Sequence, residues 1–227
     1  MKAVYRKELK FIAYKSEFLR LKKHLDSLME PDEHSGPFGY MVRSLYFDSL
    51  FDRDLYDKLD GLQNKEKIRI RIYDYKSQTA LLELKRKRGS DGIKRKIILT
   101  REEALAMIEG DYSCLAGRSD PLSFHIYSRL IQGAYSPKTI VEYNRLAYKY
   151  PVSDTRVTFD TEVRASMMPH GLFLKDPGYI PVIPGDQGVL EVKFNDFFPG
   201  PLREILTFAD RQPSANSKYS QARLATY

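Results

Sequence analysis

Residues 67–73 read Lys-Ile-Arg-Ile-Arg-Ile-Tyr, an alternation of charged or polar and aliphatic side chains. Such alternation is typical of a β-strand, because successive side chains of a strand point to opposite faces. The strand is therefore expected to have an apolar face of three isoleucines and a charged face of Lys67, Arg69, Arg71 and Tyr73.

The same period-two pattern recurs along the chain and predicts eight strands. We expect them at about residues 3–12, 40–48, 66–75, 79–87, 93–100, 138–149, 155–164 and 187–195. The run 88–92, Arg-Gly-Ser-Asp-Gly, is typical of a hairpin turn. Helical spacing predicts helices over 16–29, 101–109, 121–133, 200–210 and 214–224, whereas the proline- and glycine-rich residues 168–188 predict a long loop.

These elements favour an α+β fold with an antiparallel sheet, in a single domain over residues 1–227. An eight-stranded antiparallel β-barrel with flanking helices would form a tunnel lined by one face of each strand. Helices 16–29, 121–133 and the C-terminal helices would then cover the apolar outer faces. For any single strand, the commoner arrangement is a charged face turned to water.

The formal net charge is +7, from 37 Lys and Arg against 30 Asp and Glu. Residues 65–101 hold thirteen basic and four acidic side chains, whereas the other 190 residues hold 24 basic and 26 acidic ones. The stretch 65–101 is thus net +9 and the rest is net −2. A surplus confined to one stretch of strands predicts an anionic partner.

The composition favours a cytoplasmic protein without membrane insertion. Cys114 is the only cysteine, so a disulfide framework is excluded. The sequence has no apolar stretch of the roughly 20 residues that a membrane span needs, and its first ten residues do not resemble a signal peptide. The four histidines lack metal-ligand spacing and are interpreted as surface or structural residues.

Converging Arg and Lys side chains repel one another, and a polyphosphate is the anion that matches them, because guanidinium groups bind phosphate oxygens bidentately. Carboxylates on the same strand faces would suit Mg²⁺ or Mn²⁺, since hard cations prefer oxygen ligands. The candidates are Glu8, Glu83, Glu162 and Glu191. Structural ion pairs are an equally good interpretation of Glu83 and Glu162.

Nine short motifs, in order, resemble those of the vacuolar transporter chaperone (VTC) polyphosphate polymerases, in the CYTH or triphosphate tunnel metalloenzyme superfamily. The likeness covers about residues 5–222 and is greatest to stand-alone bacterial members. The motifs are Glu8-Leu9-Lys10, Ser44-Leu45-Tyr46-Phe47-Asp48, the stretch 67–73, Glu83-Leu84-Lys85, Lys94-Arg95-Lys96, Tyr143-Asn144-Arg145, the stretch 156–161, Leu190-Glu191-Val192-Lys193 and Ser217-Lys218-Tyr219-Ser220.

The resemblance implies an ATP-dependent polyphosphate polymerase, in which a divalent metal assists transfer of the ATP γ-phosphate to a growing polyphosphate chain. It implies catalytic roles for Lys10, Arg69, Arg71 and Lys85, and metal ligation by Glu191 and Glu8. It also implies substrate binding by Lys58, Lys94, Lys96, Tyr143, Arg145, Arg156, Lys193 and Lys218. ATP and polyphosphate are the expected partners, and no nucleic acid is expected. Lys58 departs from the arginine of the eukaryotic proteins.

Two other functions stay open on the sequence. A tunnel triphosphatase would use the same residues to hydrolyse inorganic triphosphate. A non-catalytic polyanion-binding module, for nucleic acid for example, would use the basic strands alone.

Overall fold

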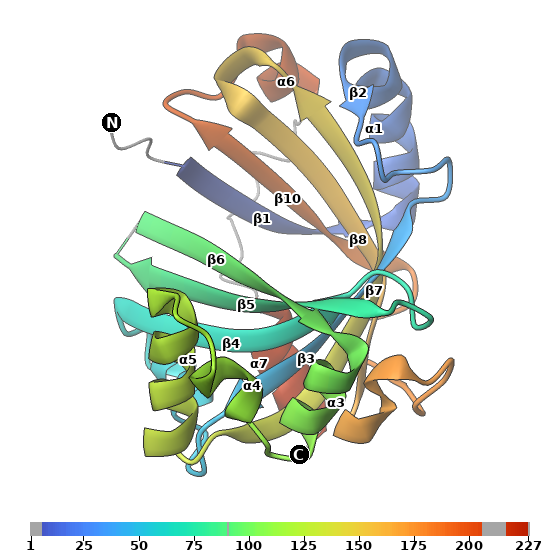
Figure 1. The fold of residues 1–227 in the computed structure, drawn as a ribbon. Coiled ribbons are helices and arrows are strands. Elements are labelled where there is room, and N and C mark those ends of the chain that lie inside the picture. The colour runs from blue at the N-terminus through green and yellow to red at the C-terminus, as the bar shows by residue number, and fades with distance from the viewer. Residues whose placement is uncertain (1–5, 90, 206–216, 227) are drawn as a thin grey trace. The chain divides into compact units, whose positions relative to one another are not determined.

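The computed structural model describes residues 6–89, 91–205 and 217–226 (Figure 1). Its strands form one sheet in the order β1-β10-β8-β7-β3-β4-β5-β6, with β2 paired to β7 and β9 paired to β8. The strands are β1 (Arg6–Tyr14), β2 (Glu30–Pro31), β3 (Tyr40–Asp48), β4 (Asn64–Ile72), β5 (Thr79–Arg88), β6 (Asp91–Thr100), β7 (Ser136–Tyr150), β8 (Thr155–Ser166), β9 (Ile180–Pro181) and β10 (Gln187–Asn195).

The helices are α1 (Lys15–Leu28), α2 (Arg53–Leu59), α3 (Arg101–Ile108), α4 (Ser113–Ala116), α5 (Pro121–Gln132), α6 (Gly200–Ile205) and α7 (Lys218–Ala225), with 3₁₀ turns at Val152–Asp154 and Pro169–Phe173. Among the described residues, no helix has the length and apolar character to span a membrane. The predicted helices 200–210 and 214–224 and the predicted strand 3–12 extend into segments outside the described residues.

The α+β class with a large antiparallel sheet is confirmed, but the closed eight-stranded barrel is wrong. The sheet has ten strands, and within the described ranges its end strands β1 and β6 are not hydrogen-bonded to each other. The two additional strands, β2 and β9, have only two residues each and end in proline, so they are too short to show alternation. Alternation assigns side chains to faces and contains no information on whether the end strands pair.

The described residues cluster into two compact units. Unit 1 comprises residues 1–41, 143–163 and 181–217, and unit 2 comprises residues 42–142, 164–180 and 218–227. The prediction of a single domain over residues 1–227 stays a prediction.

In unit 1, helix α1 covers the apolar face of β1, β10 and β8, as expected for residues 16–29 (Figure 1). Phe18 stacks on Phe159 with their ring centroids 3.8 Å apart, and Leu21 and Leu25 are buried in the same core. The other faces of these strands are therefore left for the charged side chains.

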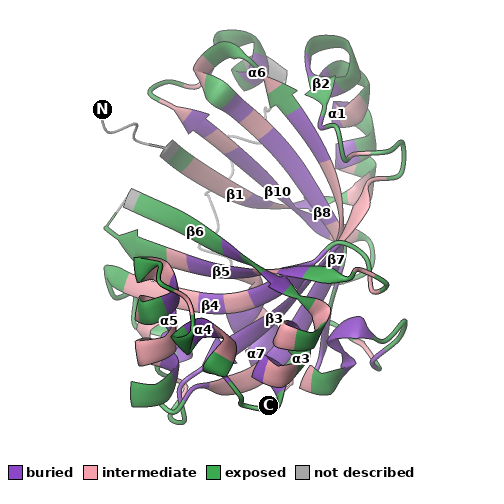
Figure 2. Ribbon diagram, viewed as in Figure 1, coloured by how far each residue is buried: buried purple, intermediate pink, exposed green. Residues whose placement is uncertain are grey.

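In unit 2, the isoleucines of β4 are fully buried, and helices α3, α4 and α5 lie beside β4, β5 and β6 (Figures 1 and 2). The Thr100–Glu103 capping box at the start of α3 is confirmed, and Asp120 caps α5 through the amide of Ser123. The hairpin predicted at 88–92 is confirmed by the pairing of β5 with β6. Helix 121–133 thus covers an apolar face, as expected.

The C-terminal helix α7 does not cover an apolar face, contrary to expectation. Its Tyr219 ring stacks on Tyr46 at 4.9 Å between centroids, and the Lys67 ammonium lies 4.8 Å from the Tyr219 centroid. Tyr46 is the register partner of Arg69, so α7 packs on the charged face of unit 2.

The alternation of β8 is interrupted at Glu162, whose φ of 54° is in the left-handed region. Arg164 therefore does not continue the face of Arg156 and Asp160, where strict alternation would place it, but pairs with Glu142 at 2.5 Å. Residues 168–188 also contain the 3₁₀ turn Pro169–Phe173 and strand β9, where a continuous loop was expected.

Candidate functional site

The candidate site residues divide evenly between the two units. Unit 2 contains Lys58, Arg69, Arg71, Lys85, Lys94, Lys96 and Lys218, and unit 1 contains Glu8, Lys10, Tyr143, Arg145, Arg156, Glu191 and Lys193.

Strand register brings the unit 2 residues together on the charged face of β4, β5 and β6. Arg69, Glu83 and Lys96 form one row across the three strands, and Lys67, Lys85 and Lys94 form the next row. Arg71 and Lys58 of helix α2 complete a group that we call the cationic cluster: Lys58, Lys67, Arg69, Arg71, Lys85, Lys94 and Lys96.

Glu83 lies in the middle of the cationic cluster and is only 1% exposed. Its carboxylate lies 2.6 Å from Arg69, 3.8 Å from Arg71 and 3.1 Å from Lys94. Burial by itself would raise the pKa of Glu83, but the three cations outweigh it and hold the pKa at about 2. Glu83 is thus ionised and paired with three cations, as in the structural interpretation.

Two side chains of β3 fix the guanidinium groups. Arg69 donates to the Tyr46 hydroxyl at 2.9 Å, and Arg71 donates to the Ser44 hydroxyl at 3.0 Å. Burial raises the pKa of Tyr46, but Arg69, Arg71 and Lys67 outweigh it and lower the pKa to about 8. The guanidinium groups are therefore oriented before any anion binds.

Lys67 of the cluster has a lowered pKa. Desolvation is the main cause that lowers its pKa to about 8, and the charges of Lys58 and Lys85 lower it further. An anion bound here would restore the full charge of Lys67, because it would offset both effects.

Helices α2 and α7 are held at this face by two aspartates of unit 2, the buried Asp48 and the half-buried Asp52. Asp48 accepts from the backbone amides of Asp54 and Leu55 at 2.8 and 3.0 Å, and from the Tyr219 hydroxyl at 2.5 Å. The Arg223 guanidinium donates to both oxygens of Asp52, at 2.9 and 2.7 Å. These contacts place Lys58 and Lys218 on short helices beside the strands.

Unit 1 has a second charged group, which we call the Glu–Lys cluster: Glu8, Lys10, Glu191 and Lys193. The Lys10 ammonium lies 2.7 Å from Glu8 and 3.6 Å from Glu191, and Lys193 also pairs with Glu191. Desolvation is the main cause that lowers the pKa of Lys193. Two carboxylates of neighbouring strands thus converge on one cation.

The unit 1 arginines are paired with buried aspartates. Arg145 donates to both oxygens of Asp160, at 2.6 and 2.8 Å, and lies over the Tyr143 ring. Although burial lowers the pKa of Arg145, Asp160 outweighs it and raises that pKa well above its usual value. Arg156 lies 2.9 Å from Asp32. Each pair fixes its arginine while leaving some of its N–H groups for another acceptor.

The VTC domain family model matches residues 5–227. The chain belongs to the VTC domain family. The chain matches no curated protein.

Among solved structures, the VTC domain is similar to a Bacillus halodurans protein named as a candidate adenylate cyclase. The identity is 15%, the match covers 94% of this chain and 95% of that one, and the TM-score is 0.53. A candidate adenylate cyclase of Vibrio parahaemolyticus gives 13% identity, 91% and 87% coverage and a TM-score of 0.46. The PH1819 protein of Pyrococcus horikoshii is 12% identical, the match covers 98% of this chain and 100% of that one, and the TM-score is 0.48. The first likeness shows the fold alone, and the other two carry no argument.

The donor set of the Glu–Lys cluster fits a divalent cation such as Mn²⁺ or Mg²⁺. Glu8 and Glu191 offer carboxylate oxygens that already converge on the Lys10 ammonium. Thr158 is the register partner of Glu191, and its buried hydroxyl makes no hydrogen bond within the described residues. These are the hard oxygen donors that such cations select. Asp32, Glu33 and His34 could also approach one ion, but Asp32 is paired with Arg156 and the other two are exposed.

Several residues that hold the charged side chains of the site in place were not among the candidates predicted from the sequence. Tyr46 and Tyr219 lie inside two of the quoted motifs, and the alternation of strand 40–48 would have placed Ser44 and Tyr46 on one face. Asp32 carries no such signal, because it lies between short elements and reaches Arg156 across 124 positions of the sequence.

Proposed function

We propose that this VTC domain is an ATP-dependent polyphosphate polymerase assisted by Mn²⁺ or Mg²⁺. The observation that carries the proposal is the cationic cluster, where Lys and Arg side chains of β4, β5, β6 and α2 gather beside the buried carboxylate of Glu83. Such a surplus is costly without an anion, and a chain of phosphates supplies many oxygens at close spacing.

In the proposed reaction, a terminal oxygen of the polyphosphate chain attacks the γ-phosphorus of ATP. The new P–O bond forms as the bond to ADP breaks, so the chain grows by one phosphate and ADP leaves. Phosphoryl transfer needs mostly positioning and charge neutralisation. Arg69, Arg71 and Lys85 would bind the transferring phosphates, and the orientation of both arginines by β3 hydroxyls supports that role.

The remaining candidates are assigned within the same proposal. Lys58, Lys94, Lys96 and Lys218 of unit 2 would bind chain phosphates, and Tyr143, Arg145, Arg156 and Lys193 of unit 1 would bind substrate. Lys10 is proposed as a catalytic cation, and Glu8 and Glu191 as metal ligands. A bound divalent cation would supply further neutralisation of phosphate charge.

The test is incubation with ATP and Mn²⁺, followed by sizing of the products on a polyacrylamide gel. Chains longer than triphosphate are expected, and orthophosphate as the sole product would contradict the proposal. Arg71→Gln should reduce turnover by about 100-fold or more, because it removes a charged donor to the transferring group. Lys76→Gln, which removes a charge from an exposed turn of unit 2, is the matched control.

Glu191→Gln tests the metal assignment separately. Turnover should fall by about 100-fold while the affinity for tripolyphosphate changes little, because only the metal ligand is lost. Glu30→Gln, on the exposed strand β2 of unit 1, is the control. Equal turnover of both variants at limiting Mn²⁺ would refute the role of Glu191.

A further inference from the structure

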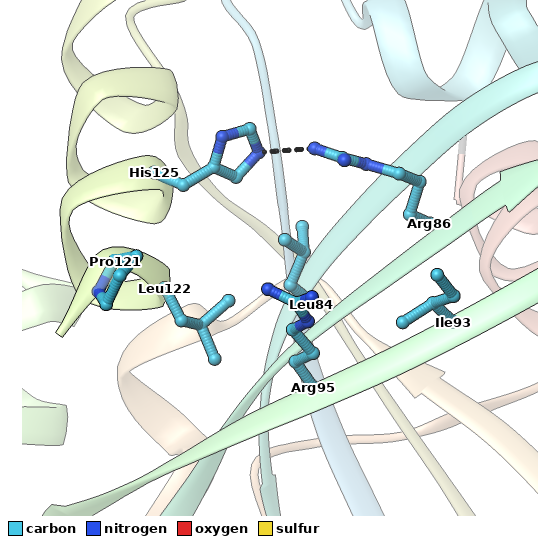
Figure 3. A pocket seen from close by; sticks show the side chains of 7 residues that line it. All are labelled: Leu84, Arg86, Ile93, Arg95, Pro121, Leu122 and His125. Atoms are coloured by element: carbon cyan, nitrogen blue, oxygen red, sulfur yellow. Dashed lines mark hydrogen bonds between the residues drawn. The ribbon is translucent and has the colours of Figure 1, made fainter. Parts of the chain in front are cut away.

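Unit 2 contains a cavity on the face of the β5–β6 hairpin opposite the cationic cluster. Its volume is about 190 Å³, and it is lined by side chains of β5, β6 and the first turns of α5 (Figure 3). The residues that matter for its chemistry are Leu84, Arg86, Ile93, Arg95, Leu122 and His125.

The register of β5 and β6 brings arginines and aliphatic side chains together in the cavity. Leu84 is the partner of Arg95, and Arg86 is the partner of Ile93, so each cross-strand pair joins one arginine to one aliphatic side chain. Both pairs share a face with the buried aliphatic residues Ala80 and Leu82 of β5, whereas Glu83 and Lys85 lie on the other face. The cavity is therefore separate from the cationic cluster.

The cavity has a surplus of positive charge. Arg86 pairs with Glu66, and its Nη2 lies 3.0 Å from His125 Nε2, as Figure 3 shows. Glu66 is shared with Arg129, 3.3 Å away. Arg95 forms no ion pair with any side chain that the structure describes. Arg129 also pairs with Asp54 at 2.7 Å, so Arg95 is the source of the surplus positive charge at the cavity.

The same cavity offers apolar surface. Leu84 is buried at its base, Leu122 is half-buried on α5, and Ile93 is 57% exposed at its edge. An exposed isoleucine beside two guanidinium groups would bury its side chain against a ligand that carries an apolar group next to its charge.

We propose that this cavity binds a small organic anion, in which a phosphate or carboxylate group is joined to a compact apolar body. Arg95 and Arg86 would bind the oxyanion through their N–H groups, and Leu84, Ile93 and Leu122 would contact the apolar body. The cavity is smaller than the roughly 300 Å³ at which pockets for drug-sized ligands begin, so the ligand has about a dozen heavy atoms. The proposal does not depend on the polymerase activity.

Phenyl phosphate is a suitable probe, observed through the NMR signals of the Leu84, Ile93 and Leu122 methyl groups. These signals should shift on titration, with an affinity about tenfold or more above those of inorganic phosphate and of phenol, each of which lacks one half of the ligand. A parallel titration with benzoate distinguishes a carboxylate ligand from a phosphate ligand. Binding of inorganic phosphate at this cavity as tight as that of phenyl phosphate would overturn the proposal.

Arg95→Gln should weaken phenyl phosphate binding at least tenfold. Arg88→Gln is the matched control, because Arg88 lies on the same face of β5 as Arg86 and does not line the cavity. Leu122→Ala should reduce the preference for phenyl phosphate over inorganic phosphate. Equal affinities of the Arg95 and Arg88 variants would show that the cavity is not the binding site.

Discussion

At the scale of single residues, Glu83 shows how the charged face is tolerated before a ligand binds. It is a buried acid whose pKa of about 2 reflects the three cations around it. Removing one partner of a buried ion pair is destabilising, because the remaining charges stay desolvated without compensation. Glu83 therefore stabilises the cluster, and under the proposed function it would compete with phosphate for the same arginines.

We expect Glu83→Gln to lower the free energy of unfolding by about 3 kcal/mol, equivalent to a melting temperature lower by about 6 to 12 °C. Tripolyphosphate should restore much of this loss, because it supplies the missing negative charge. Thermal unfolding with and without tripolyphosphate tests this. A variant as stable as the wild type without ligand would contradict it.

The carboxyl group of Glu83 also predicts how the free energy of unfolding changes at acidic pH. The folded-state pKa of Glu83, about 2, lies below its ordinary value of 4.5. Its contribution is therefore complete above about pH 4.5 and is lost as the pH falls towards 2. Chemical unfolding of the wild type should show a steeper loss of stability in this window than that of Glu83→Gln.

Lys67 and Tyr46 predict a weakening of phosphate binding at high pH. Each has a pKa of about 8, so above that pH Lys67 loses its positive charge and Tyr46 gains a negative one. Both changes reduce attraction for an anion. The dissociation constant of tripolyphosphate should rise from pH 7 to pH 9, and Lys67→Arg, which keeps its charge, should reduce that rise. Equal pH dependence in both proteins would exclude Lys67 as the cause.

At the scale of elements, α7 is too short to be stable alone and is held by its side chains. Arg223 binds Asp52 through two hydrogen bonds, and Tyr219 binds Asp48 and stacks on Tyr46. The helix α7 therefore contacts both Asp52, at the start of α2, and Tyr46, the residue that orients Arg69.

Arg223→Gln should destabilise the protein by about 2 to 3 kcal/mol and increase amide hydrogen exchange within residues 218–225. Tripolyphosphate should bind more weakly as well, because Tyr219 and Lys218 lose their fixed positions. Leu224→Ala, an exposed change on the same helix, is the control. Unchanged exchange in α7 would show that the Asp52 pair does not anchor it.

At the scale of the whole molecule, charge is divided unequally between the units. Unit 1 has 14 basic and 14 acidic side chains, whereas unit 2 has 23 and 16, so unit 2 accounts for the entire net charge of +7. Long-range attraction of a polyanion is therefore expected to act mainly on unit 2.

Hydrogen exchange with mass spectrometry can test this at low ionic strength. Tripolyphosphate at low occupancy should protect β4, β5 and β6 more than β1, β8 and β10, and added salt should reduce the protection. Stronger protection of the unit 1 strands would contradict the expected distribution of binding.

The sequence was informative where a strand has one charged and one apolar face. The alternation at 67–73 and 83–87 correctly assigned Arg69, Arg71 and Glu83 to one face. It could not show the left-handed residue Glu162, which shifts Arg164 to a different partner, or the position of α7, which depends on Tyr219 and Asp48 far apart in the chain. The closure of a sheet is likewise a long-range property that periodicity does not contain.

The pairing of β1 with β10 has a consequence for synthesis of the protein. Arg6 is the register partner of Asn195, so β1 cannot complete its pairing with β10 until residue 195 has left the ribosome. Most of unit 2 is contiguous over residues 42–142, and β3, β4, β5 and β6 pair with near neighbours in sequence. We expect these strands to fold during translation, while the nascent β1 keeps an unpaired edge that chaperones can bind.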